Sequence, residues 1–99
     1  MIPEIGRDIN HYYSIVTRKN IVGIRIRAAR QAAKYSQEKL AAEMQLLGIK
    51  IDRTAIAKLE SGRRPASDIE IIAIAKILNI SIPDLFKDSD KLFSRLQTL

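Results

Sequence analysis

The chain has 99 residues, of which 46% are hydrophobic and 28% charged, a composition that predicts a soluble globular protein with one modest core. It contains no cysteine, so a disulfide framework and a zinc finger are excluded. No stretch approaches the ~20 apolar residues that a membrane-spanning helix requires and the N-terminus lacks a signal-peptide core, so we expect a cytoplasmic location.

The net charge of +6 is concentrated in the middle of the chain. Residues 18–64 carry 12 basic and 4 acidic side chains, a balance of +8, whereas residues 1–17 and 65–99 each have a balance of −1. A local excess of positive charge predicts binding to a polyanion, which can be a nucleic acid or an anionic membrane surface.

Residues 1–20 form an N-terminal extension. Its apolar side chains recur three or four positions apart, which predicts a helix packed on the domain or on a second subunit; they are Ile2, Ile5, Ile9, Tyr12 and Val16. Gly6 and the β-branched residues 15–17 favour the alternative, a loose terminus. His11 is the single histidine, and because the chain supplies no partner for a catalytic or metal-binding role, we interpret it as a surface residue.

A helix is predicted from about Ile21 to Lys34, with Asn20 as its N-cap. Its apolar side consists of Val22, Ile26, Ala29 and Ala33. Arg30 lies near this side, and a guanidinium group close to the core requires a carboxylate partner, because an unpaired buried charge is strongly destabilising.

Two further helices, joined by a turn, are predicted at about 37–47 and 53–61. Ser36 can cap the first and Gly48 can end it, and its buried side is expected to carry Leu40, Ala41, Met44 and Leu47. The connection to the second helix is apolar as well, with Leu46, Leu47, Ile49 and Ile51. We therefore expect the connection to pack against the core rather than to project into solvent.

Asp52 can cap the second of these helices, and Ile51 and Ile56 have the spacing of a hydrophobic staple. Ile56 and Leu59 share the buried side. The opposite face is basic and begins with short side chains; it carries Arg53, Thr54, Ala57, Lys58 and Ser61, with Arg63 and Arg64 just beyond the end of the helix. A helix with such a face suits the major groove of DNA, which presents hydrogen-bonding base edges.

A fourth helix follows Pro65, because Ser67 and Glu70 have the spacing of a capping box and Asn79 suits a left-handed residue at the end. Its core-facing residues are expected to be Ile71, Ile74, Ala75 and Leu78. Its other sides are apolar too, through Ile69, Ile72 and Ile77, so we expect this helix to lie at the centre of the fold.

Ser81 can cap a short fifth helix from Ile82, with Leu85 and Phe86 closing the core. Residues 88–99 form a C-terminal extension with a candidate helix, since Leu92, Phe93, Leu96 and Leu99 again have helical spacing. Apolar stripes at both ends of a small domain can cover its own core or join two copies. We expect a homodimer.

The pieces SQEKLA, RTAIAKLESGRR and NISIPDLF, in this order and spacing, make residues 21–86 resemble the Cro/CI-type (phage-repressor-like) helix-turn-helix DNA-binding domain. The resemblance implies an all-α fold, with a five-helix lambda-repressor-like domain at 21–87 between N- and C-terminal extensions at 1–20 and 88–99. It also implies that Arg30 pairs with Glu60, which stands just before the last glycine of the recognition helix. The chain departs from the family pattern between Leu40 and Asp52, where it is longer.

The recognition helix of this resemblance is the one predicted at about 53–61. Arg53, Thr54 and Lys58 match base-reading positions, and their donors and methyl group suit guanine and thymine edges. Gln37 matches a phosphate-contacting glutamine at a helix N-terminus. Ser61, Arg63 and Arg64 are expected to contact phosphates, which position a protein without reading sequence.

The function expected from the sequence is sequence-specific double-stranded-DNA binding by a transcriptional regulator, with repression as the leading expectation, without cofactor or metal, and with a partner protein as a candidate source of regulation. The sequence does not choose between promoter occlusion and recruitment of polymerase. Two alternatives remain: a protein-interaction module, such as an antitoxin-like partner, and a protein that coats nucleic acid regardless of sequence. An enzyme is not expected, because the sequence has no cysteine nucleophile, Gly-rich phosphate loop, metal-ligand cluster or histidine partner for a serine.

Overall fold

The computed structural model describes residues 17–87 and 89–97, and these residues form six α-helices. The all-α fold expected from the sequence is confirmed. Of the N-terminal extension, only residues 17–20 are described. Its apolar stripe and His11 lie outside the described residues.

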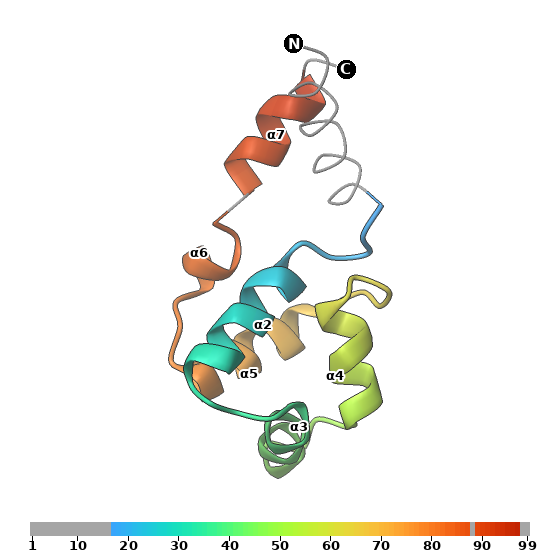
Figure 1. The fold of residues 1–99 in the computed structure, drawn as a ribbon, viewed down its shortest axis with the longest axis vertical. Helices are drawn as coiled ribbons and strands as arrows, with labels where there is room; N and C mark the ends of the chain where they lie inside the picture. Colours follow the sequence, from blue (N-terminus) through green and yellow to red (C-terminus); the bar gives the residue numbers. More distant parts are fainter. Residues whose placement is uncertain (1–16, 88, 98–99) are drawn as a thin grey trace.

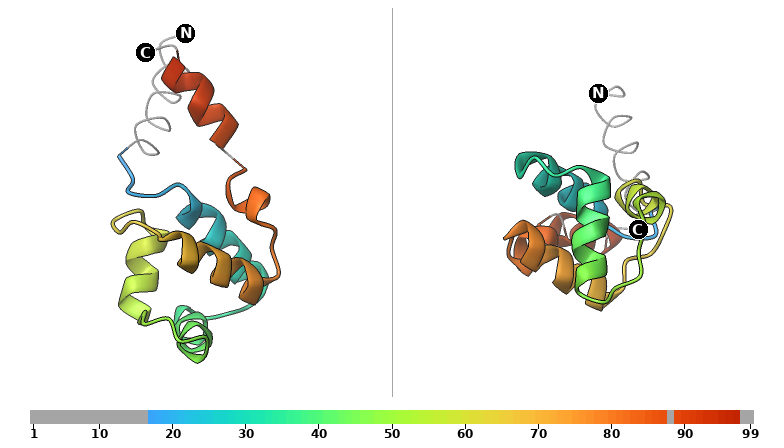
Figure 2. Two further views of the ribbon diagram at one scale, coloured as in Figure 1. Left: turned by 180° about the vertical axis from the view of Figure 1, so that it is seen from behind. Right: turned by 90° about the horizontal axis from the view of Figure 1, so that it is seen from below.

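Five helices form the body of the protein: α2 (Val22–Ala32), α3 (Gln37–Leu46), α4 (Arg53–Glu60), α5 (Asp68–Leu78) and α6 (Ile82–Leu85). α2 and α5 lie side by side, α4 stands beside them, and α3 lies at the lower end of the body (Figure 1). Figure 2 shows α3 along its length, seen from below. A sixth helix, α7 (Ser89–Gln97), extends from the opposite end and has no buried residue. This arrangement matches the expected lambda-repressor-like domain.

The helix starts are set by side chains that the sequence places there. The predicted N-caps Ser36, Asp52, Ser67 and Ser81 each accept a hydrogen bond from the backbone N–H three residues further on. Glu70 completes the capping box at the start of α5. Asn79 ends α5 in the left-handed conformation, with φ 54°. These local predictions are confirmed.

The core takes large side chains from all five helices of the body. Those that are fully buried are Val22, Ile26, Leu40, Met44, Ile56, Leu59, Ile74 and Leu85. Ile51, which precedes α4, is buried with them, as the predicted staple with Ile56 requires. The core therefore fixes both helices of the helix-turn-helix.

The prediction that the whole apolar connection after α3 packs against the core is wrong for two of its residues. Leu46 is 81% exposed and Leu47 is 51% exposed. α3 ends at Leu46, and the chain then turns through Gly48 and returns to bury Ile51. Because Ile51 supplies the core side chain at this end of α3, the two leucines remain on the solvent side.

The prediction that α5 is central is also wrong in part. Ile69 is 65% exposed and Ile72 is 56% exposed. The neighbours α2, α3 and α6 contact the side of α5 that carries Ile74 and Leu78, and they leave the opposite side open. A smaller correction concerns Ala33, which is exposed because α2 ends one residue earlier, before a left-handed turn at Lys34.

Two leucines of α3 provide a matched test of this packing. Leu40→Ala should lower the free energy of unfolding by roughly 2–5 kcal/mol, because it leaves a cavity in the core. Leu46→Ala should change it by less than about 0.5 kcal/mol, because that side chain is mostly in solvent. Urea unfolding of both variants measures the difference, and a similar loss for both would show that the end of α3 is packed.

Candidate nucleic-acid interface

The helix-turn-helix consists of α3, the connection 47–52 and α4, and the two helices are in contact. Asp52 Oδ1 accepts a hydrogen bond from Ala55 N at 2.8 Å and so starts α4. Ile56 and Leu59 are fully buried on the inner side of α4. The outer side of this helix is thereby fixed toward solvent.

The three residues expected to read bases lie together on that outer side. Arg53, Thr54 and Lys58 are all exposed. A shallow hollow beside them is lined by Thr54, Lys58 and the turn that follows the helix, where Arg63 and Arg64 stand. Hydrogen-bond donors therefore border this hollow, together with the carboxylate of Asp52.

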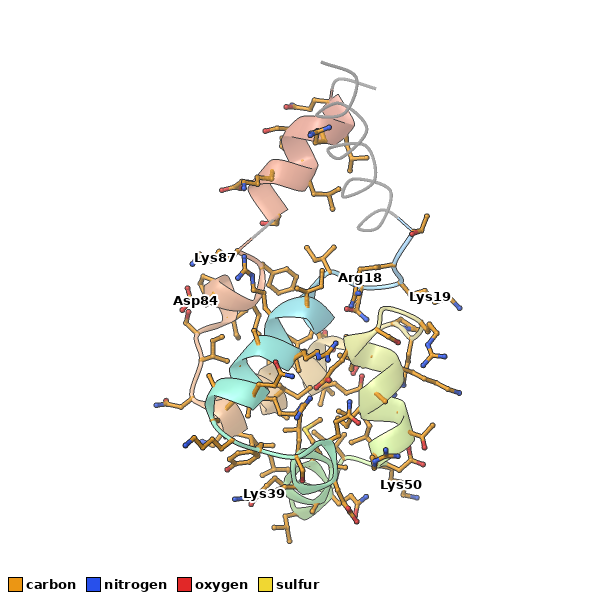
Figure 3. The ribbon with its side chains drawn as sticks, in the orientation of Figure 1. Arg18, Lys19, Lys39, Lys50, Asp84 and Lys87 are labelled. Atoms are coloured by element: carbon orange, nitrogen blue, oxygen red, sulfur yellow. The ribbon has the colours of Figure 1, made fainter. Side chains whose placement is uncertain are left out.

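Further basic side chains lie at the two ends of α4. Figure 3 shows Lys19 beside its C-terminal end and Lys50 beside its N-terminal end. Both lysines are exposed. Lys19 and Lys50 thus extend the positive charge of Arg53 and Lys58 to both ends of α4, where it can attract a phosphate backbone, whereas Lys39 lies on the other side of the molecule (Figure 3).

The turn after α4 holds the residues expected to contact phosphates, and they differ in their surroundings. Ser61 Oγ donates to the carbonyl of Lys58 at 3.1 Å, and Arg63 Nε donates to Ser61 Oγ at 3.0 Å. Ser61 and Arg63 are both exposed. Arg63 therefore lies exposed at the edge of the candidate interface, where its guanidinium group is accessible to a phosphate.

Arg64 has another partner in the structure. Its guanidinium donates from Nη1 and Nη2 to the two carboxylate oxygens of Glu70, at 2.9 and 2.8 Å. The hydrogen bond with Glu70 raises the pKa of Arg64, and the same hydrogen bond lowers the pKa of Glu70 against the opposing effect of burial. This pair joins the turn to the capping box of α5. Both Nη atoms of Arg64 are thus engaged by Glu70, so Arg64 is less available than Arg63 to bind a phosphate.

Arg30 and Glu60 are brought together beneath the interface. Arg30 Nε donates to Glu60 Oε2 at 2.6 Å and its Nη2 donates to Oε1 at 3.2 Å, with both side chains almost fully buried. Arg30 Nη1 also donates to the carbonyl of Tyr35 at 2.7 Å. Gln37, expected at a phosphate, donates its amide to Glu60 Oε1 at 3.1 Å. The network joins α2, the start of α3 and the last residue of α4.

Residues that the sequence reasoning did not assign to the interface hold the C-terminal end of α4. Arg18 Nη2 donates to the carbonyl of Glu60 at 2.6 Å. Asn20, predicted as an N-cap, accepts from Gly23 N at 2.7 Å and also donates to the carbonyls of Leu59 and Arg64, at 3.0 and 2.6 Å. Because the carbonyl partners of Arg18 and Asn20 are about forty positions away in the sequence, no local pattern could have indicated them.

Other kinds of site receive no support within the described ranges, 17–87 and 89–97. They contain no group of three or more His, Cys, Asp or Glu side chains arranged to hold a metal ion. They also contain no helix long and apolar enough to cross a membrane. The basic surface around α4 is thus the candidate binding site.

The Arg64–Glu70 pair predicts a pH dependence. Because the pKa of Glu70 is lowered from its ordinary 4.5, the pair stabilises the fold above that pH, and this contribution is lost as the pH falls through the lowered pKa. Glu70→Gln keeps the capping box and should cost roughly 1 kcal/mol near pH 7. The difference from wild type should vanish in acid, measured by urea unfolding from pH 7 to below 4.5.

Glu43→Gln on α3 is the control for the loss of one carboxylate. A constant difference between Glu70→Gln and wild type at every pH would contradict the assignment, because a purely steric effect does not titrate.

Two comparisons agree with this geometry. A helix-turn-helix family model matches residues 26–85, which include α3, α4 and α5. The crystal structure of the restriction-modification controller protein C.AhdI from Aeromonas hydrophila is similar to this chain, with 34% identity and a TM-score of 0.58, over 77% of this chain and 97% of that one. No match was found among curated protein sequences. The chain belongs to the Cro/CI-type helix-turn-helix family of DNA-binding transcriptional regulators.

Proposed function

We propose that this chain is a repressor that binds a specific double-stranded operator as a homodimer. The observation that carries the proposal is the outer side of α4, where Arg53, Thr54 and Lys58 project from a helix whose inner side is fully buried. A varied set of donors on a fixed helix suits base recognition, whereas a uniform lysine surface would suit coating.

Each residue of the interface receives a role from its position. Arg53, at the first turn of α4, donates to a guanine edge, Thr54 contacts a thymine methyl group or a base acceptor, and Lys58 extends the contact by one turn. Ser61, Arg63 and the N-terminus of α3 at Gln37 hold phosphates on either side. Gln37 has a second amide hydrogen for this contact while the first is donated to Glu60.

Repression follows from occupancy of an operator that overlaps a promoter. The similarity to C.AhdI, a restriction-modification controller protein, makes the promoters of restriction and modification genes the first operators to test. A reporter gene under such a promoter should fall in expression when the chain is supplied; a rise would show that it activates instead.

Base reading is tested by fluorescence anisotropy on a selected duplex and a scrambled duplex over a series of salt concentrations. The selected duplex should bind ~10³-fold tighter or more. Arg53→Ala should cost roughly 1–3 kcal/mol on the selected duplex and relax its base preference, whereas Arg63→Ala should weaken both duplexes and flatten the salt slope by about 1.

Lys87→Ala is the matched control, because this exposed cation lies on the side of the molecule away from α4 (Figure 3). Equal losses for Arg53→Ala and Arg63→Ala on every duplex would show that α4 does not read bases. Equal affinity of the wild type for both duplexes would favour the coating protein.

The dimer seam is proposed on the open side of α5. Ile69 and Ile72 are exposed on one face of this helix, and the charges of Asp68 and Lys76 stand at the two ends of the same face. If two copies of α5 meet antiparallel across a two-fold axis, Asp68 of each copy lies near Lys76 of the other while the isoleucines pack between them. The face is therefore self-complementary.

A charge exchange tests this seam. Lys76→Asp places like charges opposite each other and should weaken the dimer, and Asp68→Lys combined with Lys76→Asp should restore it, as measured by sedimentation equilibrium. Leu46→Glu, on an exposed leucine of α3, is the control for surface acidity. If Phe93→Glu dissociates the dimer and the α5 variants leave it intact, the seam lies on α7 instead.

A further inference from the structure

We propose that Arg18, Lys19 and Asn20, here called the N-terminal clamp, position the end of the recognition helix and the turn 61–64 on DNA. This inference rests on the proposed operator binding and adds residues to it. The clamp precedes α2 and stands outside the residues 26–85 that match the family model.

The clamp binds a row of backbone carbonyls at the end of α4. Asn20 donates to Leu59 and Arg64 at 3.0 and 2.6 Å, and Arg18 donates to Glu60 at 2.6 Å. Lys19 adds a backbone hydrogen bond from its N–H to the carbonyl of Gly62 at 2.8 Å. The last carbonyls of a helix lack partners from the regular helical pattern, so the clamp supplies donors where α4 ends; the Leu59 carbonyl accepts from Gly62 N–H at 3.1 Å as well.

Charge and packing reinforce the same contacts. The positive guanidinium of Arg18 stands at the negative end of the α4 dipole, a favourable position. Partial burial lowers the pKa of Arg18. The side chain lies directly over Gly62, where a Cβ atom would be 2.7 Å from Arg18 Cγ. Gly62 has φ +79°, so this residue accommodates both the turn and the arginine above it.

The clamp acts on the segment that carries the phosphate contacts. Ser61 and Arg63 belong to the same turn, and the carbonyls that the clamp binds lie immediately before, within and after this pair. Arg18 itself is occupied by Asn20 and Glu60, with its Nε donating to the carbonyl of Asn20 at 3.0 Å. The clamp residues are therefore positioning residues, and Arg63 makes the contact with phosphate.

A double-mutant cycle tests the clamp in the full chain. Arg18→Met should weaken binding to the selected duplex by about 10-fold and flatten the salt slope by roughly 1, because Arg63 is no longer held at its phosphate. In an Arg63→Ala background the same change should have little further effect, since the contact it positions is already gone. Additive effects of the two changes on binding would overturn the proposal.

Two controls separate positioning from loss of stability or charge. Leu85→Ala, in the core at α6, lowers stability without touching the clamp and should leave affinity unchanged at a temperature where each variant is folded by circular dichroism. Lys87→Met removes one exposed positive charge elsewhere. If Arg18→Met binds DNA as well as Leu85→Ala does, the clamp has only a structural role and the proposal fails.

Asn20→Asp provides a second variant in case Arg18→Met does not fold. It keeps the acceptor for Gly23 N–H but removes the donors to Leu59 and Arg64, and it should weaken binding in the same way. Failure of the proposed operator binding is recognised separately, from equal affinity of the wild type for both duplexes. In that case the scrambled duplex replaces the selected one in the same cycle, and an unchanged salt slope in Arg18→Met overturns the clamp.

Discussion

The buried ion pair between Arg30 and Glu60 is the contact on which the placement of the recognition helix depends. A carboxylate with only 3% of its side chain exposed is tolerable only when it is paired and hydrogen-bonded, and Glu60 receives charged donors from Arg30 and a neutral amide donor from Gln37. Since Glu60 is the last residue of α4, α4 cannot slide or rotate against α2 without breaking this network. The ion pair therefore neutralises a charge that would otherwise destabilise the core, and it fixes the position of α4 against α2.

The same residue is held from a second direction. Its side chain faces the interior and meets Arg30, while its carbonyl faces the turn and meets Arg18. The opposite end of α4 is fixed by the Asp52 cap and by buried Ile51. With both ends fixed and the inner side packed, the outer side of the helix keeps one orientation, and the base contacts proposed for it require little ordering of the protein on binding.

Sequence reasoning succeeded where the determining atoms are close together in the chain. The caps at Ser36 and Ser67 use partners three residues away, so composition and spacing were sufficient. The exposure of Leu46 and Ile69 depends on which helices happen to cover each side, and a hydrophobic pattern does not contain that information. Arg30 and Glu60 could be paired because charge near a core needs a partner and the family resemblance supplied it, whereas Asn20 gave no sign of its distant carbonyl partners.

The longer connection between α3 and α4 is fixed at both of its ends. Gln45 Nε2 donates to the carbonyl of Ile51 at 3.0 Å, and Ile51 is buried, so the chain leaves and re-enters the core at neighbouring points. Extra length between two such points is accommodated on the surface, where Leu47 and Lys50 stand in solvent. The connection therefore adds a cation, Lys50, beside the start of α4 at the edge of the candidate interface, while buried Ile51 keeps the start of the helix in contact with the core.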